Sequence, residues 1–190
     1  MTTENIKKQK PLSPLFYQEE RLAIVIDGPS IYAMTKIIDK IPDYKTMIEY
    51  FQEQSRLIRA HYYAAVFEDE GGFVNVRKLL DYLDYNGWAV TAKSAREYSN
   101  GGDQIKRKCN LGIDIAVDIL RHAENYDHIL LFTGDGDLLP AVKLAQERGV
   151  RFTICGLVSM VSDDLRRQAD RFIDLSEVKF GNSFNPIKVE

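Results

Sequence analysis

The sequence predicts an α/β fold: a three-layer α/β/α sandwich with a mostly parallel central sheet. Apolar runs of strand length alternate with segments of helical periodicity along the chain. Two of these runs, Leu22–Ile26 and Ile129–Phe132, are continuous, which is typical of strands buried on both faces of a parallel sheet. Each is followed by an aspartate, Asp27 or Asp135. Open α/β sheets bind ligands at the carboxyl ends of their strands, so we expect the functional site there.

Each predicted strand is rich in aliphatic, aromatic or β-branched residues. The strands are Leu22–Ile26, His61–Phe67, Trp88–Ala92, His128–Phe132, Val150–Cys155 and Phe172–Ile173. Helices are expected between them, over residues 30–39, 44–59, 73–86, 111–124, 137–148 and 162–169. Ser30 is the expected N-cap of the first helix, while Gly87 and Gly149 end two others. The second helix is expected to have one inner face, formed by Met47, Tyr50, Phe51, Gln54 and Ile58.

Residues 93–110 show no clear periodicity and form the longest irregular and most basic segment. Its cations are Lys93, Arg96, Lys106, Arg107 and Lys108. Long loops in compact domains are usually functional or disordered. We expect this loop to flank the acidic site and hold an RNA backbone, and the alternative is an ordinary solvated loop. Tyr32 and Tyr98 are candidates for stacking on bases, with simple packing as the alternative.

Composition limits the classes of protein. The formal net charge of −3 means that any nucleic-acid contact must come from a local basic patch. Cys109 and Cys155 lack the spacing of a zinc site or a disulfide framework, which suits a reducing cytosol. No apolar run reaches the roughly 18 residues of a membrane span, and no secretion signal is evident. We therefore expect a cytoplasmic protein without a membrane partner, built as a domain over residues 21–178 with tails over 1–20 and 179–190.

Five aspartates are candidate metal ligands: Asp27, Asp114, Asp118, Asp135 and Asp137. Asp114 and Asp118 lie four residues apart, hence on one face of a very apolar helix that we expect to be largely buried. Two carboxylates about 4 Å apart repel by roughly 4 kcal/mol at an effective dielectric of about 20. Converging acids must therefore be protonated, neutralised by lysines, or bound to a divalent cation. Carboxylate oxygens are ligands for Mg²⁺ and Mn²⁺. In enzymes these ions activate water for the hydrolysis of phosphodiesters, so the five acids predict a metal-dependent nuclease.

Several of these residues have a structural alternative. Asp137 is a candidate cap for a helix starting at Leu138, and Asp118 is a candidate partner of a lysine or arginine. Asp27 and Asp135 are candidate turn formers. Ser30 either caps its helix or directs its hydroxyl to the site. An EF-hand is excluded, because the acids and glycine that such a loop requires do not follow Asp135.

Four stretches resemble a known family: IVIDGPSIY, LGIDIAVDIL, LLFTGDGDLLPAVKLAQERGVRFTICG and LRRQADRFIDL. The family is the NYN domain, in its LabA-like branch of the PIN-like nuclease superfamily, and the resemblance covers about residues 21–176. It implies a Rossmann-like PIN fold and metal-dependent endoribonuclease chemistry. Asp27, Asp114 and Asp135 match its core acids, with Asp118 and Asp137 as further acids. This chain has Ser30 where the family commonly has asparagine, and Leu111 where it has lysine.

We expect an Mg²⁺- or Mn²⁺-dependent ribonuclease acting on RNA. The expected substrate-binding residues are Ser30, Tyr32, Lys93, Arg96, Lys106, Arg107 and Lys108. The alternative is a catalytically weak or inactive RNA-binding module, favoured by Ser30 and Leu111. A small-molecule phosphohydrolase is less well supported, because no phosphate-cradling glycine loop is present. Phe16, Tyr17 and residues 181–190 are candidate contacts of a homodimer.

Overall fold

The computed structural model describes residues 15–66, 72–94, 96–99 and 105–178. The expected C-terminal tail and the first 14 residues of the N-terminal one lie outside these ranges. So do the side chains of five residues of interest in the basic segment: Arg96, Tyr98, Lys106, Arg107 and Lys108.

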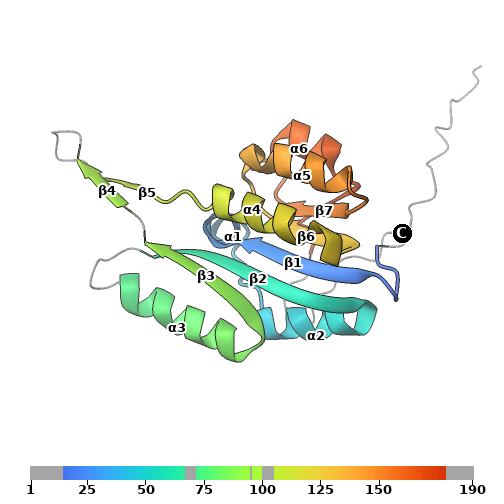
Figure 1. Cartoon of the computed structure of the whole chain (residues 1–190). Helices are drawn as coiled ribbons and strands as arrows, with labels where there is room; N and C mark the ends of the chain where they lie inside the picture. The colour runs from blue at the N-terminus through green and yellow to red at the C-terminus, as the bar shows by residue number, and fades with distance from the viewer. Residues whose placement is uncertain (1–14, 67–71, 95, 100–104, 179–190) are drawn as a thin grey trace, which may run out of the picture.

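The fold is the predicted α/β sandwich around a six-stranded sheet with the order β3-β2-β1-β6-β7-β8, in which every pair of neighbours is parallel (Figure 1). The strands of this sheet are β1 (Arg21–Asp27), β2 (Arg56–Val66), β3 (Trp88–Ser94), β6 (His128–Phe132), β7 (Arg151–Gly156) and β8 (Arg171–Asp174). Because all strands run the same way, their carboxyl ends form one edge of the sheet and their amino ends the other. We call these the carboxyl edge and the amino edge.

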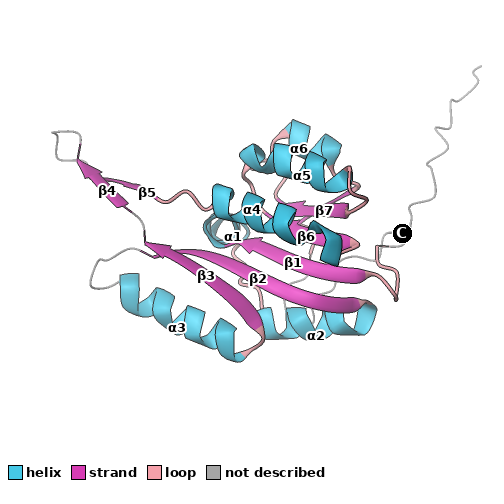
Figure 2. Ribbon diagram, in the orientation of Figure 1, coloured by secondary structure: helices cyan, strands magenta, loops and turns pink. Residues whose placement is uncertain are grey.

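Helices cover both faces of the sheet. They are α1 (Gly28–Ile38), α2 (Tyr44–Gln54), α3 (Gly72–Tyr85), α4 (Gly112–His122), α5 (Leu139–Gln146) and α6 (Asp163–Gln168), with 3₁₀ turns η1 (Ala123–Asn125) and η2 (Gly136–Leu138). Figure 2 shows α2 and α3 on one face and α4, α5 and α6 on the other. In the described part of the chain, none of these helices combines the length and apolar character needed to traverse a lipid bilayer.

The two continuous apolar runs form the centre of the core. Leu22–Ile26 in β1 and Ile129–Phe132 in β6 are at most 3% exposed. They pair with each other in parallel, with Ile26 opposite Phe132. The prediction that these runs are buried on both faces is therefore confirmed.

The second helix ends earlier than predicted. It stops at Gln54, and Ser55 is extended (φ −159°, ψ 174°) with its hydroxyl bonded to the carbonyl of Phe51. β2 begins at Arg56, so the placement of Ile58 on the inner face of a helix was wrong, and this side chain is 38% exposed. Ile58 has helical spacing with Phe51 and Gln54, although the chain changes from helix to strand at Ser55, and this spacing caused the error. Met47 and Phe51 are buried, as predicted.

The basic segment is more regular than predicted. β3 continues to Ser94, and β4 (Arg96–Ser99) pairs antiparallel with β5 (Ile105–Lys108) in a two-stranded ribbon separate from the main sheet. Figure 1 shows this ribbon extending beyond the end of β3. Strands of four residues are too short for a period of two to be recognised, so the prediction of an irregular loop was wrong here.

Part of the expected N-terminal tail packs on the domain at the amino edge. The Phe16 ring lies 5.4 Å from that of Phe51, centroid to centroid. Glu20 receives a hydrogen bond of 2.7 Å from Nε of Arg151. Residues 15–20 therefore contribute to the packing of the domain.

Candidate functional site

Asp27 and Asp135 lie where the order of the strands in the sheet reverses. From β1 the chain builds the sheet outward through β2 and β3, and from β6 it builds in the opposite direction through β7 and β8. Asp27 is the last residue of β1, and Thr133 to Asp135 directly follow β6. Such a switch point leaves a crevice above the carboxyl ends of the two central strands, where open α/β sheets bind ligands.

Asp27 is a buried carboxylate held by three donors. It is 6% exposed. Its Oδ2 accepts hydrogen bonds from the hydroxyls of Ser30 at 2.5 Å and Thr133 at 3.0 Å, and Oδ1 accepts one from the Ser30 amide at 3.5 Å. Burial raises the pKa of Asp27 above its ordinary value, the hydrogen bonds oppose this rise, and the nearby charge of Asp135 adds to it.

The N-cap of α1 is Asp27, not Ser30 as predicted. Ser30 lies in the first turn of α1 and donates both its amide and its hydroxyl to the carboxylate of Asp27. The alternative that its hydroxyl faces the site is therefore the one observed. The chain leaves β1 in an extended conformation at Asp27 and enters the helix at Gly28-Pro29, since proline is favoured in the first turn.

Thr133 links the two strand-end acids and was missed by the sequence analysis. Its side chain is fully buried. The hydroxyl donates to Oδ2 of Asp27 at 3.0 Å and accepts from the amide of Asp135 at 3.0 Å. One buried oxygen therefore fixes the position of Asp135 relative to Asp27. A threonine directly after a fully apolar strand was the available signal.

Asp135 caps the 3₁₀ turn that follows β6. Its Oδ1 accepts a hydrogen bond of 2.9 Å from the amide of Asp137, which is itself exposed. The alternative in which Asp137 caps the following helix is wrong, because the cap of η2 is Asp135 and α5 begins without a side-chain cap. Asp137 therefore remains a surface carboxylate beside Asp135.

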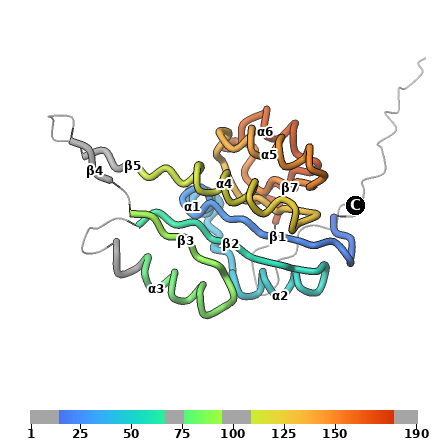
Figure 3. Tube along the Cα trace, in the orientation of Figure 1, coloured from blue at the N-terminus to red at the C-terminus, as the bar shows by residue number. Residues whose placement is uncertain are grey.

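The second oxygen of Asp135 lies against the first residue of α4. A Cβ placed on Gly112 would lie 2.8 Å from Oδ2 of Asp135, closer than real Cβ contacts. The first turn of α4 has no side-chain cap of its own. A carboxylate at this position is stabilised by the partial positive charge of the helix N-terminus. A side chain at Gly112 would therefore displace this carboxylate or the helix, and sequence reasoning missed this contact. The trace in Figure 3 shows α4 and α5 lying side by side, consistent with their packing contacts.

Asp114 is paired with a lysine from the end of β3. Nζ of Lys93 lies 2.6 Å from Oδ2 of Asp114 and also donates to the carbonyl of Asn110 at 3.1 Å. Leu111 is 4% exposed and packs in the core. The cation beside this acid therefore comes from β3 and not from the position where the family commonly has lysine.

Asp118 accepts a hydrogen bond of 2.9 Å from the hydroxyl of Tyr63 and forms an ion pair with Arg121 at 3.6 Å.

The expectation that α4 is largely buried was wrong. Ile113 and Val117 are 61% and 46% exposed, because only one side of this helix packs on the sheet and on α5.

If the site holds a divalent cation, its protein ligands are the two acids that follow β1 and β6, and not a cluster of three or more acids. Within the described ranges, no group of three or more His, Cys, Asp or Glu side chains is arranged to hold a metal ion. The charge of the Asp135 carboxylate is close enough to contribute to the raised pKa of Asp27. Mg²⁺ is commonly bound by one or two carboxylates, with water and substrate phosphate completing its shell. The donor set of Asp27 and Asp135 meets that requirement.

Of the expected substrate-binding residues, Ser30 and Lys93 contact acids of the site, as described above. Tyr32 on α1 is 62% exposed, and Nζ of Lys36 lies 4.3 Å from the centroid of its ring. Arg96, Lys106, Arg107 and Lys108 belong to the ribbon of β4 and β5, where the pairing sets Arg96 opposite Lys108.

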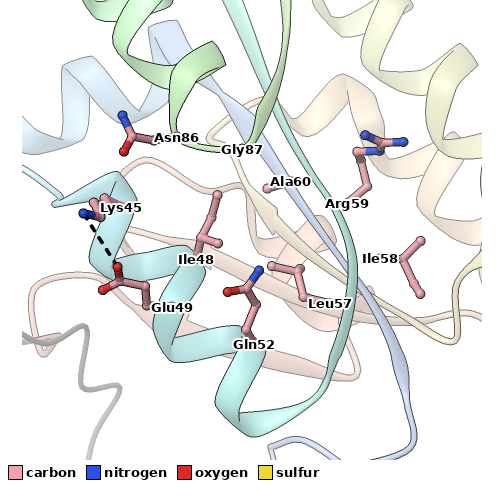
Figure 4. A pocket seen from close by; sticks show the side chains of 10 residues that line it. All are labelled: Lys45, Ile48, Glu49, Gln52, Leu57, Ile58, Arg59, Ala60, Asn86 and Gly87. Carbon is pink, nitrogen blue, oxygen red and sulfur yellow. Dashed lines mark ion pairs between the residues drawn. The ribbon is translucent and has the colours of Figure 1, made fainter.

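A hollow of about 340 Å³ lies away from these acids, between α2, the start of β2 and the turn before β3. Figure 4 shows its lining residues: Lys45, Ile48, Glu49, Gln52, Leu57, Ile58, Arg59, Ala60, Asn86 and Gly87. Lys45 and Glu49 face each other on α2 with an Nζ–Oε1 distance of 4.0 Å. Since this hollow lies at the amino edge, it is separate from the acidic site.

Comparisons with known proteins bear on the family and the fold of this chain. The family model described as NYN domain matches residues 21–176. The chain is 29% identical over 169 residues to the Low amplitude and bright protein LabA of Synechococcus elongatus, a match that covers 86% of this chain and 88% of LabA. A crystal structure of a Vibrio parahaemolyticus protein of unknown function aligns with a TM-score of 0.69 and 23% identity, covering 84% of this chain and 95% of that one. The structural match supports the fold.

Proposed function

Since this chain belongs to the NYN domain family, we propose that it is a metal-dependent ribonuclease that hydrolyses RNA phosphodiester bonds at the carboxyl edge of its sheet. The observation that carries the proposal is the linkage of Asp27 and Asp135 through the hydroxyl of Thr133. This linkage joins the carboxylate of Asp27 to the backbone amide of Asp135, so both acids lie at the switch point, and the charge of Asp135 adds to the rise in the pKa of Asp27. An acid pair held in this way is suited to a divalent cation.

In this proposal Asp27 and Asp135 would hold Mg²⁺ or Mn²⁺. Asp114 on α4 and Asp137 in η2 are not assigned as ligands of the ion. The ion, when bound, supplies a nucleophile from water and stabilises charge on the phosphate. Thr133 and Ser30 keep the carboxylate of Asp27 oriented through their hydroxyl groups. Lys93 holds Asp114 and presents a cation, 44% exposed, to a phosphate of the substrate.

The basic ribbon and Tyr32 are proposed to bind the RNA on either side of the scissile bond. Cations that contact phosphates give binding that is salt-sensitive and largely independent of sequence. Such a local patch is compatible with the net charge of −3, because only the surface near the site needs to be positive.

The test is cleavage of end-labelled single-stranded RNA by the full chain with Mn²⁺ or Mg²⁺, with and without EDTA. Cleavage is expected with the metal, and we expect it to disappear with EDTA and in the Asp135→Asn variant. Asp84→Asn is the matched control, because Asp84 is an exposed acid on α3. Cleavage by Asp135→Asn at the rate of the parent protein would contradict the proposal.

A second candidate is an RNA-binding module of the same fold without cleavage. The observation that favours it is the ion pair of Lys93 with Asp114, which neutralises an acid that the family resemblance makes catalytic. RNA binding in EDTA, with no cleavage in either metal, would select this candidate over the nuclease.

A further inference from the structure

A second hollow, of about 330 Å³, lies over α6 and β8 and contains two arginines. Its lining residues are Asp163, Arg166, Arg167 and Phe172. Arg166 donates through Nη2 to Oδ1 of Asp163. Nη2 of Arg167 lies 4.0 Å from Oδ2 of the same carboxylate. Two guanidinium groups therefore share one acid, which leaves the lining of the hollow with one excess positive charge.

The guanidinium groups have unused hydrogen-bond donors. Nε of Arg166 is buried, and it has no hydrogen-bond partner in the described structure. The side chain of Arg167 is 78% exposed. Each guanidinium carries five N–H donors, more than one shared carboxylate can satisfy. The exposed guanidinium of Arg167 therefore has donors left for a ligand with several acceptor oxygens, such as a phosphate.

An aromatic ring lies beside these donors. Phe172 is partly buried against the core, and Cζ of Arg166 lies over its ring, 5.8 Å from the centroid. A base can stack on an aromatic ring whatever its sequence, and a nearby guanidinium strengthens such contacts. The hollow thus combines a phosphate-binding group with a surface for a base.

The hollow and the turn that carries the acids both adjoin α6. Ser162 caps this helix, and a Cβ on Gly136 would lie 2.9 Å from its hydroxyl oxygen. Gly136 separates Asp135 from Asp137, so α6 begins against the turn that carries the acids. Arg166 lies four residues after Ser162, which is about 6 Å along the helix axis at a rise of 1.5 Å per residue. α6 therefore connects the turn that carries Asp135 and Asp137 with the hollow.

We propose that this hollow is a nucleotide subsite for single-stranded RNA. Arg166 and Arg167 bind a phosphate next to the scissile one, and Phe172 stacks on the attached base. The inference rests on the proposed function for its substrate class, but it concerns binding and not cleavage.

The test measures binding of a fluorescein-labelled oligouridylate by fluorescence anisotropy in EDTA, with Asp135→Asn as the parent so that no cleavage occurs. Arg167→Ala is expected to weaken binding about 10-fold and to reduce the slope of log affinity against log salt by about 1. Phe172→Leu is expected to weaken binding about 10-fold with an unchanged salt slope, because stacking releases no counterions. Arg56→Ala, an exposed arginine at the amino edge, is the matched control and should bind like the parent.

Both variants are checked by thermal unfolding, and Arg167→Glu serves as a second variant because this side chain is exposed. Binding by Arg167→Glu and Phe172→Leu as tight as that of the parent would overturn the subsite and leave the nuclease proposal standing. RNA binding that depends on Arg167, in a chain that does not cleave RNA with metal, would support the subsite and reject the nuclease. Absence of any RNA binding by the parent would overturn the subsite, whereas cleavage of RNA by the unmutated chain with metal decides the nuclease proposal separately.

Discussion

The acids at the two edges of the sheet differ in whether they are paired with cations. At the amino edge, Arg21 pairs with Asp127 at 2.7 Å and Arg151 pairs with Glu20 at 2.7 Å. At the carboxyl edge, the charge of Asp135 contributes to the raised pKa of Asp27, and neither acid forms an ion pair with any side chain that the structure describes.

The pKa values show the same contrast. The hydrogen bond from Arg21 lowers the pKa of Asp127, whereas burial raises that of Asp27. The charge of Asp127 therefore favours folding at neutral pH, while the charge of Asp27 opposes it. Variants at the amino edge should lose stability and keep activity, and variants at the carboxyl edge should do the reverse.

The largest effect is expected for Asp27→Asn. Its RNA cleavage should fall by about 10³-fold, as for loss of a central catalytic group. Its free energy of unfolding in urea should stay the same or rise, because a buried charge is removed. Asp127→Asn is the control from the amino edge and should retain cleavage. A large loss of stability in Asp27→Asn would break the contrast between the edges.

Arg151→Met tests the amino edge. Glu20 is 9% exposed and His128 is 1% exposed, so removing the arginine leaves a carboxylate poorly solvated. The free energy of unfolding should fall by about 3 kcal/mol, typical of breaking a buried ion pair. Adding Glu20→Gln should restore part of the loss. A decrease in cleavage under conditions where the variant is folded would contradict the assignment of this edge to stability.

His128 gives the amino edge a pH dependence. Burial and the charge of Arg151 lower its pKa to about 4, from 6.5 in a model peptide. Below about pH 6.5 the unfolded chain binds a proton that the folded protein excludes, so stability should decrease as the pH falls to about 4 and then level off. At about pH 5 the decrease is about 2 kcal/mol. Urea unfolding across this range measures it, and His128→Gln should remove this part of the dependence.

The smallest effects are expected for substitutions of two buried threonines, Thr133 and Thr153. Thr133 joins the acids at the carboxyl edge, whereas Oγ1 of Thr153 is 2.8 Å from Nε2 of His128. Thr133→Val should reduce cleavage about 10-fold, because the positions of Asp27 and Asp135 are no longer coupled. Thr153→Val should leave cleavage unchanged and reduce stability by about 1 kcal/mol, the usual value of one hydrogen bond. Equal effects of the two substitutions on cleavage would contradict a special role for Thr133.

The sheet and its acidic edge could be predicted because their signals are local. Continuous apolar runs identify β1 and β6, and the residues that follow them must lie at one edge of a parallel sheet. The contacts of Thr133 with Asp27 and of Gly112 with Asp135 join residues far apart in the sequence. No periodicity in the chain encodes such contacts. The pairing of Lys93 with Asp114 likewise depends on how the end of β3 meets the start of α4.

The same limitation explains the errors in the elements. Ile58 has helical spacing with Phe51, but the conformation of Ser55 ends the helix first. The ribbon of β4 and β5 arises from pairing between its two strands. Short strands of this kind have too few residues to show their alternation.

The approach of Gly112 to Asp135 makes the shape of the acidic edge sensitive to a single methyl group. A methyl group at this position carries no charge and binds no metal, yet it would lie 2.8 Å from Oδ2 of Asp135. To admit it, either the helix must retreat or the carboxylate must rotate away. Gly112→Ala therefore alters the shape of the site while every titratable group of the protein is retained.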